Sequence, residues 1–83
     1  WGASSRGVMF SLLAQRQGCN IIGAIDINPA KQNRYMPGSG IFISDVVEGM
    51  RLLREDVSVV VTNRNYLSEV MQLVGKRCDV VPV

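Results

Sequence analysis

Two kinds of apolar segment alternate along this chain, and their order constrains the fold more than any other feature of the sequence. Three segments repeat their apolar residues at the spacing of one helix face, over residues 5–17, 46–55 and 66–74. Three further runs are mostly apolar and too short for helices, as is typical of strands buried on both faces: residues 20–26, 57–62 and 78–81. Because helices alternate with buried strands, the sequence predicts a parallel sheet with helices on both faces.

The ends of the predicted helices carry residues that start or stop helices. Gly18 follows the polar end of the first helix and is expected to be its C-cap. Asp45 precedes the second helix, and together with Glu48 it forms a variant of the capping box. We expect this second helix to end near residue 55. Asn65 is expected to cap the third helix.

The size and composition fit one small globular domain of residues 1–83. A chain of this length buries only about 60–68% of its unfolded surface, so its core is thin. The net charge of +2 comes from scattered residues, without the clustered cations and aromatic side chains of a nucleic-acid surface. No apolar run reaches the ~18–20 residues of a membrane span. With only two cysteines, the chain does not resemble a disulfide-rich scaffold, and without His a structural zinc site is not expected. Because the sequence also shows no signal peptide, we expect a soluble, cytoplasmic domain.

Residues 1–7 look like the turn between a first strand and the first helix, yet no strand precedes them in the sequence. We therefore expect a fragment of a longer chain. The expected architecture is a Rossmann-like three-layer parallel sheet whose first strand lies outside the fragment. The alternative is that a partner supplies the missing strand pairing.

Gly2-x-x-x-x-Gly7 lies directly before a helix and about 20 residues ahead of Asp26, which is the layout of a nucleotide-binding turn. Glycines let the backbone approach a ligand, and a helix N-terminus offers free N–H groups. A carboxylate that ends the next strand can accept hydrogen bonds from ribose hydroxyls. Ser4 replaces the middle glycine of the usual pattern, which disfavours a tightly held pyrophosphate. The candidate binding residues are Gly2, Ser4, Ser5 and Asp26, and the alternative is a serine-capped turn that binds nothing.

The loop over residues 28–40 is longer than the ~2–6 residues usual between such elements. Long ordered loops at the carboxyl ends of parallel strands often bind ligands. Lys31 can bind an anion, and Tyr35 can stack on a ring. Pro37 and Gly38 form a turn in the same loop, and all four residues are candidates for the site. A surface loop whose charges only keep it soluble is the alternative.

Asn63, Asn65 and Tyr66 follow the run at residues 57–62, at the carboxyl end of a predicted strand. Their amide groups can donate to and accept from a sugar or a base, and Tyr66 can stack. Asn65 serves equally well as a helix cap alone. We expect this segment and the loop after Asp26 to line one cleft.

No catalytic group is evident in the chain. Cys19 and Cys78 each border a predicted strand, and we expect buried thiols that act as small hydrophobic groups. A cysteine nucleophile needs a base beside it, and the chain contains no His. We therefore expect that this chain alone is not catalytic, holds no metal and carries no cofactor of its own.

Five stretches that span nearly the whole chain carry a resemblance to a known family: Gly2-Ala3-Ser4-x-x-Gly7, Asp26-x-Asn28-Pro29-x-Lys31-Gln32, Tyr35-x-Pro37-Gly38, Ile41-Phe42-Ile43 and Asn65-Tyr66-x-x-Glu69. The chain resembles the C-terminal domain of the sugar C-methyltransferases, which methylate carbon atoms of nucleotide-linked deoxysugars with S-adenosylmethionine. The resemblance implies a Rossmann-type module that packs against the methyltransferase domain and helps to hold the nucleotide sugar. It also implies that S-adenosylmethionine and the general base belong to an upstream domain, preceded by a cysteine-rich zinc module.

Two other families share this plan. The N-terminal domains of sugar O- and N-acyltransferases also begin with a glycine-rich turn, end their second strand in Asp and bind a nucleotide sugar. Hexapeptide repeats normally follow those domains. The interpretation as a regulatory or oxidoreductase module that binds NAD rests only on the turn and on Asp26, and Ser4 disfavours it.

Overall fold

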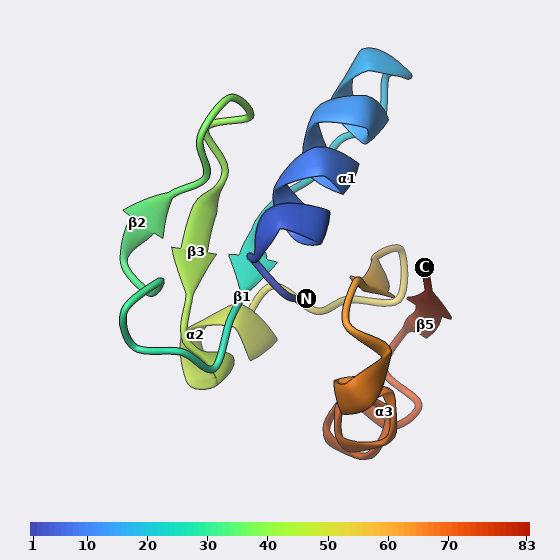
Figure 1. Ribbon diagram of the computed structural model, residues 1–83. Helices are drawn as coiled ribbons and strands as arrows, with labels where there is room; N and C mark the ends of the chain where they lie inside the picture. Colours follow the sequence, from blue (N-terminus) through green and yellow to red (C-terminus); the bar gives the residue numbers. More distant parts are fainter.

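The computed structural model describes residues 1–83, and Figure 1 shows two parts on either side of the N-terminus. The first part contains two helices and three strands: α1 (Ser5–Arg16), β1 (Ala24–Ile25), β2 (Arg34–Tyr35), β3 (Phe42–Ser44) and α2 (Val46–Met50). The second part contains two strands, a 3-10 turn and a helix: β4 (Ser58–Val61), η1 (Arg64–Tyr66), α3 (Leu67–Val74) and β5 (Asp79–Pro82). The predicted α/β class is therefore confirmed. None of the helices is both long enough and apolar enough to cross a membrane.

The strands pair in two separate sheets. In the first sheet, β1 pairs in parallel with β3, whereas β2 pairs with β3 in the antiparallel direction. In the second sheet, β4 and β5 pair in parallel, with Val59 opposite Val80. The parallel pairs agree with the prediction. The prediction of a single, wholly parallel sheet is wrong, because the ladder is interrupted between β1 and β4 and because β2 runs against its neighbour.

One strand of the antiparallel pair, β2, lies inside residues 28–40, which we expected to be a loop. The N–H of Met36 donates to the carbonyl of Ile41 at 2.7 Å, and the N–H of Gly40 donates to the carbonyl of Met36 at 3.0 Å. Gly38 and Gly40 have φ angles of 82° and 71°, a region that suits glycine. The segment therefore turns back on itself as a hairpin and buries Met36.

The strand expected over residues 20–26 is confirmed only at Ala24–Ile25. Both of these residues are buried, as predicted. Residues 20–23 have no regular structure, because they take part in no strand pairing.

Helices cover both faces of the first sheet. Ala24 belongs to a buried apolar cluster against which Val8 of α1 packs. Ile25 points to the opposite face, as consecutive residues of a strand do. There it meets Gly49 of α2, and a Cβ on Gly49 would overlap the Ile25 side chain. The missing side chain at Gly49 therefore lets α2 pack directly on β1.

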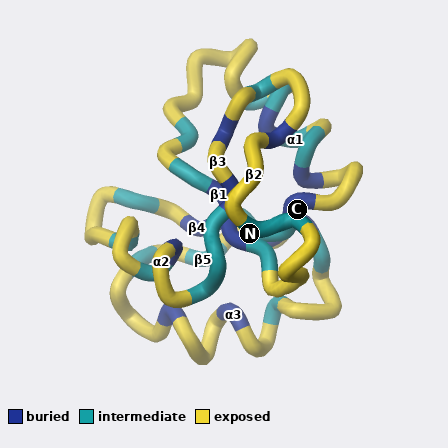
Figure 2. The backbone as a smooth tube through the Cα atoms, turned by 90° about the vertical axis from the view of Figure 1, so that its left-hand side faces the viewer, coloured by how far each residue is buried: buried dark blue, intermediate teal, exposed yellow.

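The second part has its own apolar cluster. Val61, Val70 and Val74 are at most 1% exposed and join β4 to α3, and Trp1 and Leu53 pack against the cluster. Only 14 of the 83 residues are buried, and Figure 2 shows them as short dark blue stretches between longer exposed ones. This agrees with the thin core expected of so short a chain.

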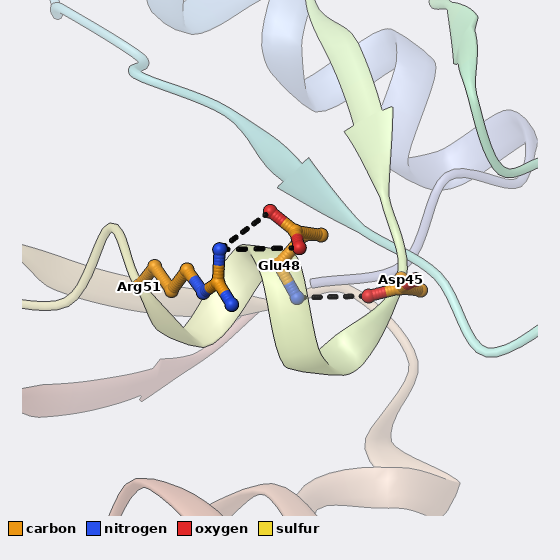
Figure 3. Close-up of polar contacts among 3 residues, drawn as sticks. All are labelled: Asp45, Glu48 and Arg51. Carbon is orange, nitrogen blue, oxygen red and sulfur yellow. Dashed lines mark hydrogen bonds and ion pairs between the residues drawn. The ribbon is translucent and has the colours of Figure 1, made fainter.

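Two predicted helix ends are confirmed. At the end of α1, Gly18 (φ 84°) and Cys19 donate to the carbonyls of Gln15 and Ala14, the two bonds of a Schellman motif. At the start of α2, the carboxylate of Asp45 accepts from the N–H of Glu48 at 2.8 Å. The Glu48 half of the predicted capping box does not form, because the Glu48 carboxylate pairs with Arg51 at 3.3 Å instead, as Figure 3 shows.

Two other predicted helix ends are wrong. Asn65 does not cap α3, which begins after Tyr66 without a side-chain cap bond. The cap lies at the 3-10 turn η1 instead, where the Asn63 side chain accepts from the N–H of Asn65 at 3.1 Å. Helix α2 ends at Met50 rather than near residue 55. Leu52 and Leu53 donate to carbonyls only three residues before them, so the chain leaves the helix through tighter turns.

Candidate functional site

The first three residues form an extended connection between the two sheets. On one side, the carbonyl of Trp1 accepts from the N–H of Thr62 at 3.1 Å, and the Trp1 amino group donates to the carbonyl of Val60 at 2.6 Å. On the other side, the N–H of Gly2 donates to the carbonyl of Ile25 at 2.8 Å. These bonds tie the carboxyl end of β1 to that of β4. Helix α1 therefore begins directly after a segment that is bonded to both strand ends, and Figure 1 shows this segment at the N-terminus.

The turn into α1 is too closely packed for side chains at two positions. Gly2 has a φ of 107°, and a Cβ there would lie 2.6 Å from Oγ1 of Thr62. A Cβ on Gly7 would overlap the carbonyl oxygen of Gly2. The buried hydroxyl of Thr62 lies 3.2 Å from the carbonyl oxygens of both Trp1 and Gly2 and donates to this pair. The two glycines thus allow the helix, the turn and β4 to meet backbone to backbone.

Asp26 lies at the carboxyl end of β1 and faces this turn. One carboxylate oxygen accepts from the N–H of Ala3 at 2.8 Å, and the other accepts from the N–H of Asn28 at 2.9 Å. The Asp26 side chain is therefore fixed by two backbone donors on opposite sides. An ionised carboxylate has about four acceptor positions, so about two remain.

A cation and free backbone donors lie beside the same turn. Nζ of Lys31 is 3.4 Å from the carbonyl oxygen of Ala3. The first turn of α1 contains no acidic residue, and Ser4 stands at the N-cap position without a side-chain cap bond. Ser4 and Ser5 are exposed. Because the first N–H groups of a helix have no partner within it, the mouth of the turn is rich in donors.

Asn63 borders the turn from the side of β4. Its backbone nitrogen is 3.9 Å from the place that a Cβ on Gly2 would occupy. Asn65 and Tyr66 follow in η1, and both are exposed. The structure therefore brings Asn63 next to the turn, with Asn65 and Tyr66 one short turn further along the chain.

Tyr35, Pro37 and Gly38 do not lie at the turn before α1. Since β2 runs antiparallel to β3, and β3 runs parallel to β1, the chain after Tyr35 leads to the amino ends of those strands. There a Cβ on Gly38 would lie 2.8 Å from the Leu12 side chain, well along α1 from its first turn. The loop after Asp26 is thus divided between two edges of the sheet, and it does not line a single cleft.

Neither cysteine is the buried thiol that we expected. Cys19 is exposed, and Cys78 is only partly buried. Desolvation and the neighbouring Asp79 raise the pKa of the Cys78 thiol, which makes its reactive thiolate scarcer. No three His, Cys, Asp or Glu side chains are grouped so that they could hold a metal ion.

Three residues that shape the turn are not among the predicted site residues, although two of them, Asn28 and Gln32, belong to a stretch that carries the resemblance. Asn28 donates to Asp26 and accepts from the N–H of Ala30 at 3.0 Å, so two Asx turns follow one another. The spacing Asp-x-Asn-Pro signals such turns and could have revealed them. Gln32 donates to the Asp26 carbonyl at 2.8 Å, and Thr62 supports Gly2. Neither contact has a sequence signal, because both depend on the tertiary fold.

The turn brings together several polar groups that suit the binding of a ligand. A carboxylate, a cation, two hydroxyls and free N–H groups can bind a polyol that carries phosphate. Comparison with protein-family models, with curated proteins and with solved structures finds no match to this chain.

Proposed function

We propose that this chain is the nucleotide-sugar-binding module of an S-adenosylmethionine-dependent sugar C-methyltransferase. The proposal rests above all on Asp26, whose carboxylate is held at the carboxyl end of β1 by the Ala3 N–H, in front of α1. In doubly wound α/β folds, ligands bind outside the carboxyl ends of the strands, and an acidic residue at this position accepts from ribose hydroxyls. The resemblance to the sugar C-methyltransferases favours a sugar nucleotide as the ligand.

Asp26 supplies the ribose contacts in this proposal. Two of its acceptor positions are used by Ala3 and Asn28. The remaining two match the adjacent hydroxyls of a ribose. Because Asp26 is already held from two sides, it loses little conformational freedom when the ligand binds.

The phosphates lie over the start of α1 in this proposal. Lys31 supplies the positive charge, and the exposed Ser4 and Ser5 supply hydroxyls and free N–H groups. On the other side of the turn, the Nδ2 amide of Asn63 is a donor for the sugar or the base. The exposed ring of Tyr66 is a stacking surface.

The methyl transfer itself belongs to another part of the enzyme. S-adenosylmethionine and the general base would come from an upstream methyltransferase domain, which is the partner that we propose for this module in a cytoplasmic enzyme. This chain would orient the nucleotide sugar toward that domain and contribute binding energy to the reaction.

We expect Asp26→Asn to weaken the binding of a thymidine- or uridine-diphosphate sugar about tenfold or more. The charge-assisted hydrogen bonds to the ribose become neutral ones, which are worth about half as much. Calorimetric titration of the 83-residue chain measures the change. The amide also keeps one acceptor for the two N–H groups that Asp26 binds, so melting curves must show that the variant is folded during the titration.

Asp56→Asn is the matched control, because Asp56 lies in the turn before β4 and its side chain is 81% exposed. Lys31→Met gives a second probe that leaves the backbone contacts of the turn intact, with Lys76→Met as its control. Equal affinities for the original chain, Asp26→Asn and Lys31→Met would contradict the proposed site.

Two measurements separate the alternatives. A module that binds NAD would bind NAD more tightly than the sugar nucleotides in the same titration. An acyltransferase domain would bind the same sugar nucleotides, but hexapeptide repeats would follow it in the full-length reading frame.

A further inference from the structure

A cavity of about 490 Å³ lies between the two sheets. Residues 19–25, which lead into β1, line one wall, and residues 56–60, which lead through β4, line the opposite wall. Ser11 and Ala14 of α1 and Leu53 after α2 border it on the remaining sides, and it is partly open to solvent. A hollow of this size between two strand edges is a place where a further segment of chain can pack.

The wall formed by β4 presents an unpaired strand edge. In a parallel strand, alternate residues bond to the neighbours on the two sides. The carbonyl of Val61 accepts from Val83 on the side of β5. Val60 and Thr62 bond instead to Trp1, on the side of the cavity. By this alternation, the N–H of Val60 also faces the cavity.

The wall formed by β1 presents a matching edge. The N–H of Asp26 donates to the carbonyl of Ser44 in β3, whereas the carbonyl of Ile25 accepts from Gly2. The N–H of Ile25 therefore lies on the side of the cavity as well. Both walls run in the same direction, because β1 and β4 end at the same turn.

Trp1 already has the hydrogen bonds of a parallel strand residue. Its nitrogen donates to Val60 and its carbonyl accepts from Thr62, which makes it the ladder partner of Val61. A strand that leads into Trp1 in this register would pass beside residues 57–60 on one side and residues 21–24 on the other.

We propose that this cavity holds a central strand, an extended apolar segment joined to the amino end of Trp1 that pairs in parallel with both β1 and β4. It would join the two sheets into one, in the order β2, β3, β1, central strand, β4, β5. The segment has to be apolar on both faces, because α1 covers one face of the cavity and Leu53 the other. This inference concerns the architecture and does not depend on the proposed ligand.

The amino group of Trp1 gives independent support. Desolvation lowers its pKa from 8.0 to about 6, against the opposing effect of Asp26, because a charge at this position is costly to bury. A peptide N–H in the same place would donate the same bond to Val60 without a charge. The position is therefore better suited to the middle of a strand than to a charged group.

The test compares two chains that are extended at Trp1 with segments of equal length. One extension is Val-Ile-Val-Val, and the other is Val-Pro-Val-Pro, which is apolar but lacks half of the N–H donors. We expect the first chain to melt at least about 10 °C above the second. We also expect the amide hydrogens of Ile25 and Val60 to exchange about tenfold more slowly in the first chain.

Equal melting temperatures and equal exchange at these two amides would overturn the proposal. So would a dimer of the 83-residue chain, detected by sedimentation, whose stability the Val-Ile-Val-Val extension leaves unchanged, since a second copy would then fill the cavity. Neither result bears on the titrations with sugar nucleotides, so the two proposals fail independently.

Discussion

Gly7→Ala is expected to unfold the domain or to lower its free energy of unfolding by at least about 3 kcal/mol. At an open position in a helix, the same change would stabilise the chain by about 1 kcal/mol. Here the new Cβ overlaps the carbonyl oxygen of Gly2, a backbone atom that cannot rotate away. Because Gly2 is bonded to Ile25 and supported by Thr62, any shift would break contacts to both sheets. Urea unfolding followed by circular dichroism measures the loss.

Gly40→Ala is the control for this prediction. Gly40 has a φ of 71° and no atom within 4 Å of its Cβ position, so the change costs only backbone strain of about 1–2 kcal/mol. If Gly7→Ala were neutral or stabilising, the close contact between α1 and the turn would be contradicted.

The stability of the 83-residue chain is expected to rise by up to about 3 kcal/mol between pH 5.5 and pH 8.5. Burial lowers the pKa of the Trp1 ammonium from 8.0 to about 6 in the folded chain. Between these two values the unfolded chain binds more protons than the folded chain, so the free energy of unfolding increases with pH. The chain contains no His, so no histidine adds to the effect in this window.

Acetylation of the Trp1 amino group provides the control, because it removes the titrating group and keeps the N–H. Urea unfolding at a series of pH values should show the rise in the free chain and a nearly flat profile in the acetylated one. The same rise in both chains would show that another group is responsible.

The sequence predicts those parts of the fold that depend on local signals. The ends of α1 and α2 follow from Gly18 and Asp45, whose caps use atoms only a few residues away. The buried pair Ala24–Ile25 and the strand before Thr62 follow from continuous apolar runs. In each case the physical cause lies within the segment itself.

Two features that the sequence analysis does not predict depend on how neighbouring segments pair and turn, rather than on a pattern within one segment. Arg34–Tyr35 is an exposed, two-residue strand without a period of its own, and only its pairing with β3 makes it one. The apolar run Ile41-Phe42-Ile43 after Gly40 was the available signal for β3. The side-chain cap is found at Asn63 and not at the predicted Asn65. Either amide fits the local pattern, and the path of the chain after β4 decides between them.

Only some of the predicted site residues lie together in the structure. Gly2, Asp26, Lys31 and Asn63 come together because Trp1 and Gly2 bond to the carboxyl ends of both β4 and β1. The hairpin places Tyr35, Pro37 and Gly38 at the amino ends of β1 and β3. The periods of helices and of buried strands do not indicate such a hairpin within a long loop.

The most direct test of the proposed function is a map of amide chemical shifts during titration of the isotope-labelled chain with a thymidine- or uridine-diphosphate sugar. We predict that residues 2–5, Asp26, Lys31 and Asn63 shift together and saturate with a single dissociation constant, while Gly38 and residues 76–79 stay unchanged. Shifts centred on Gly38 or on residues 76–79, or no shifts at millimolar ligand, would contradict a nucleotide-sugar site at this turn.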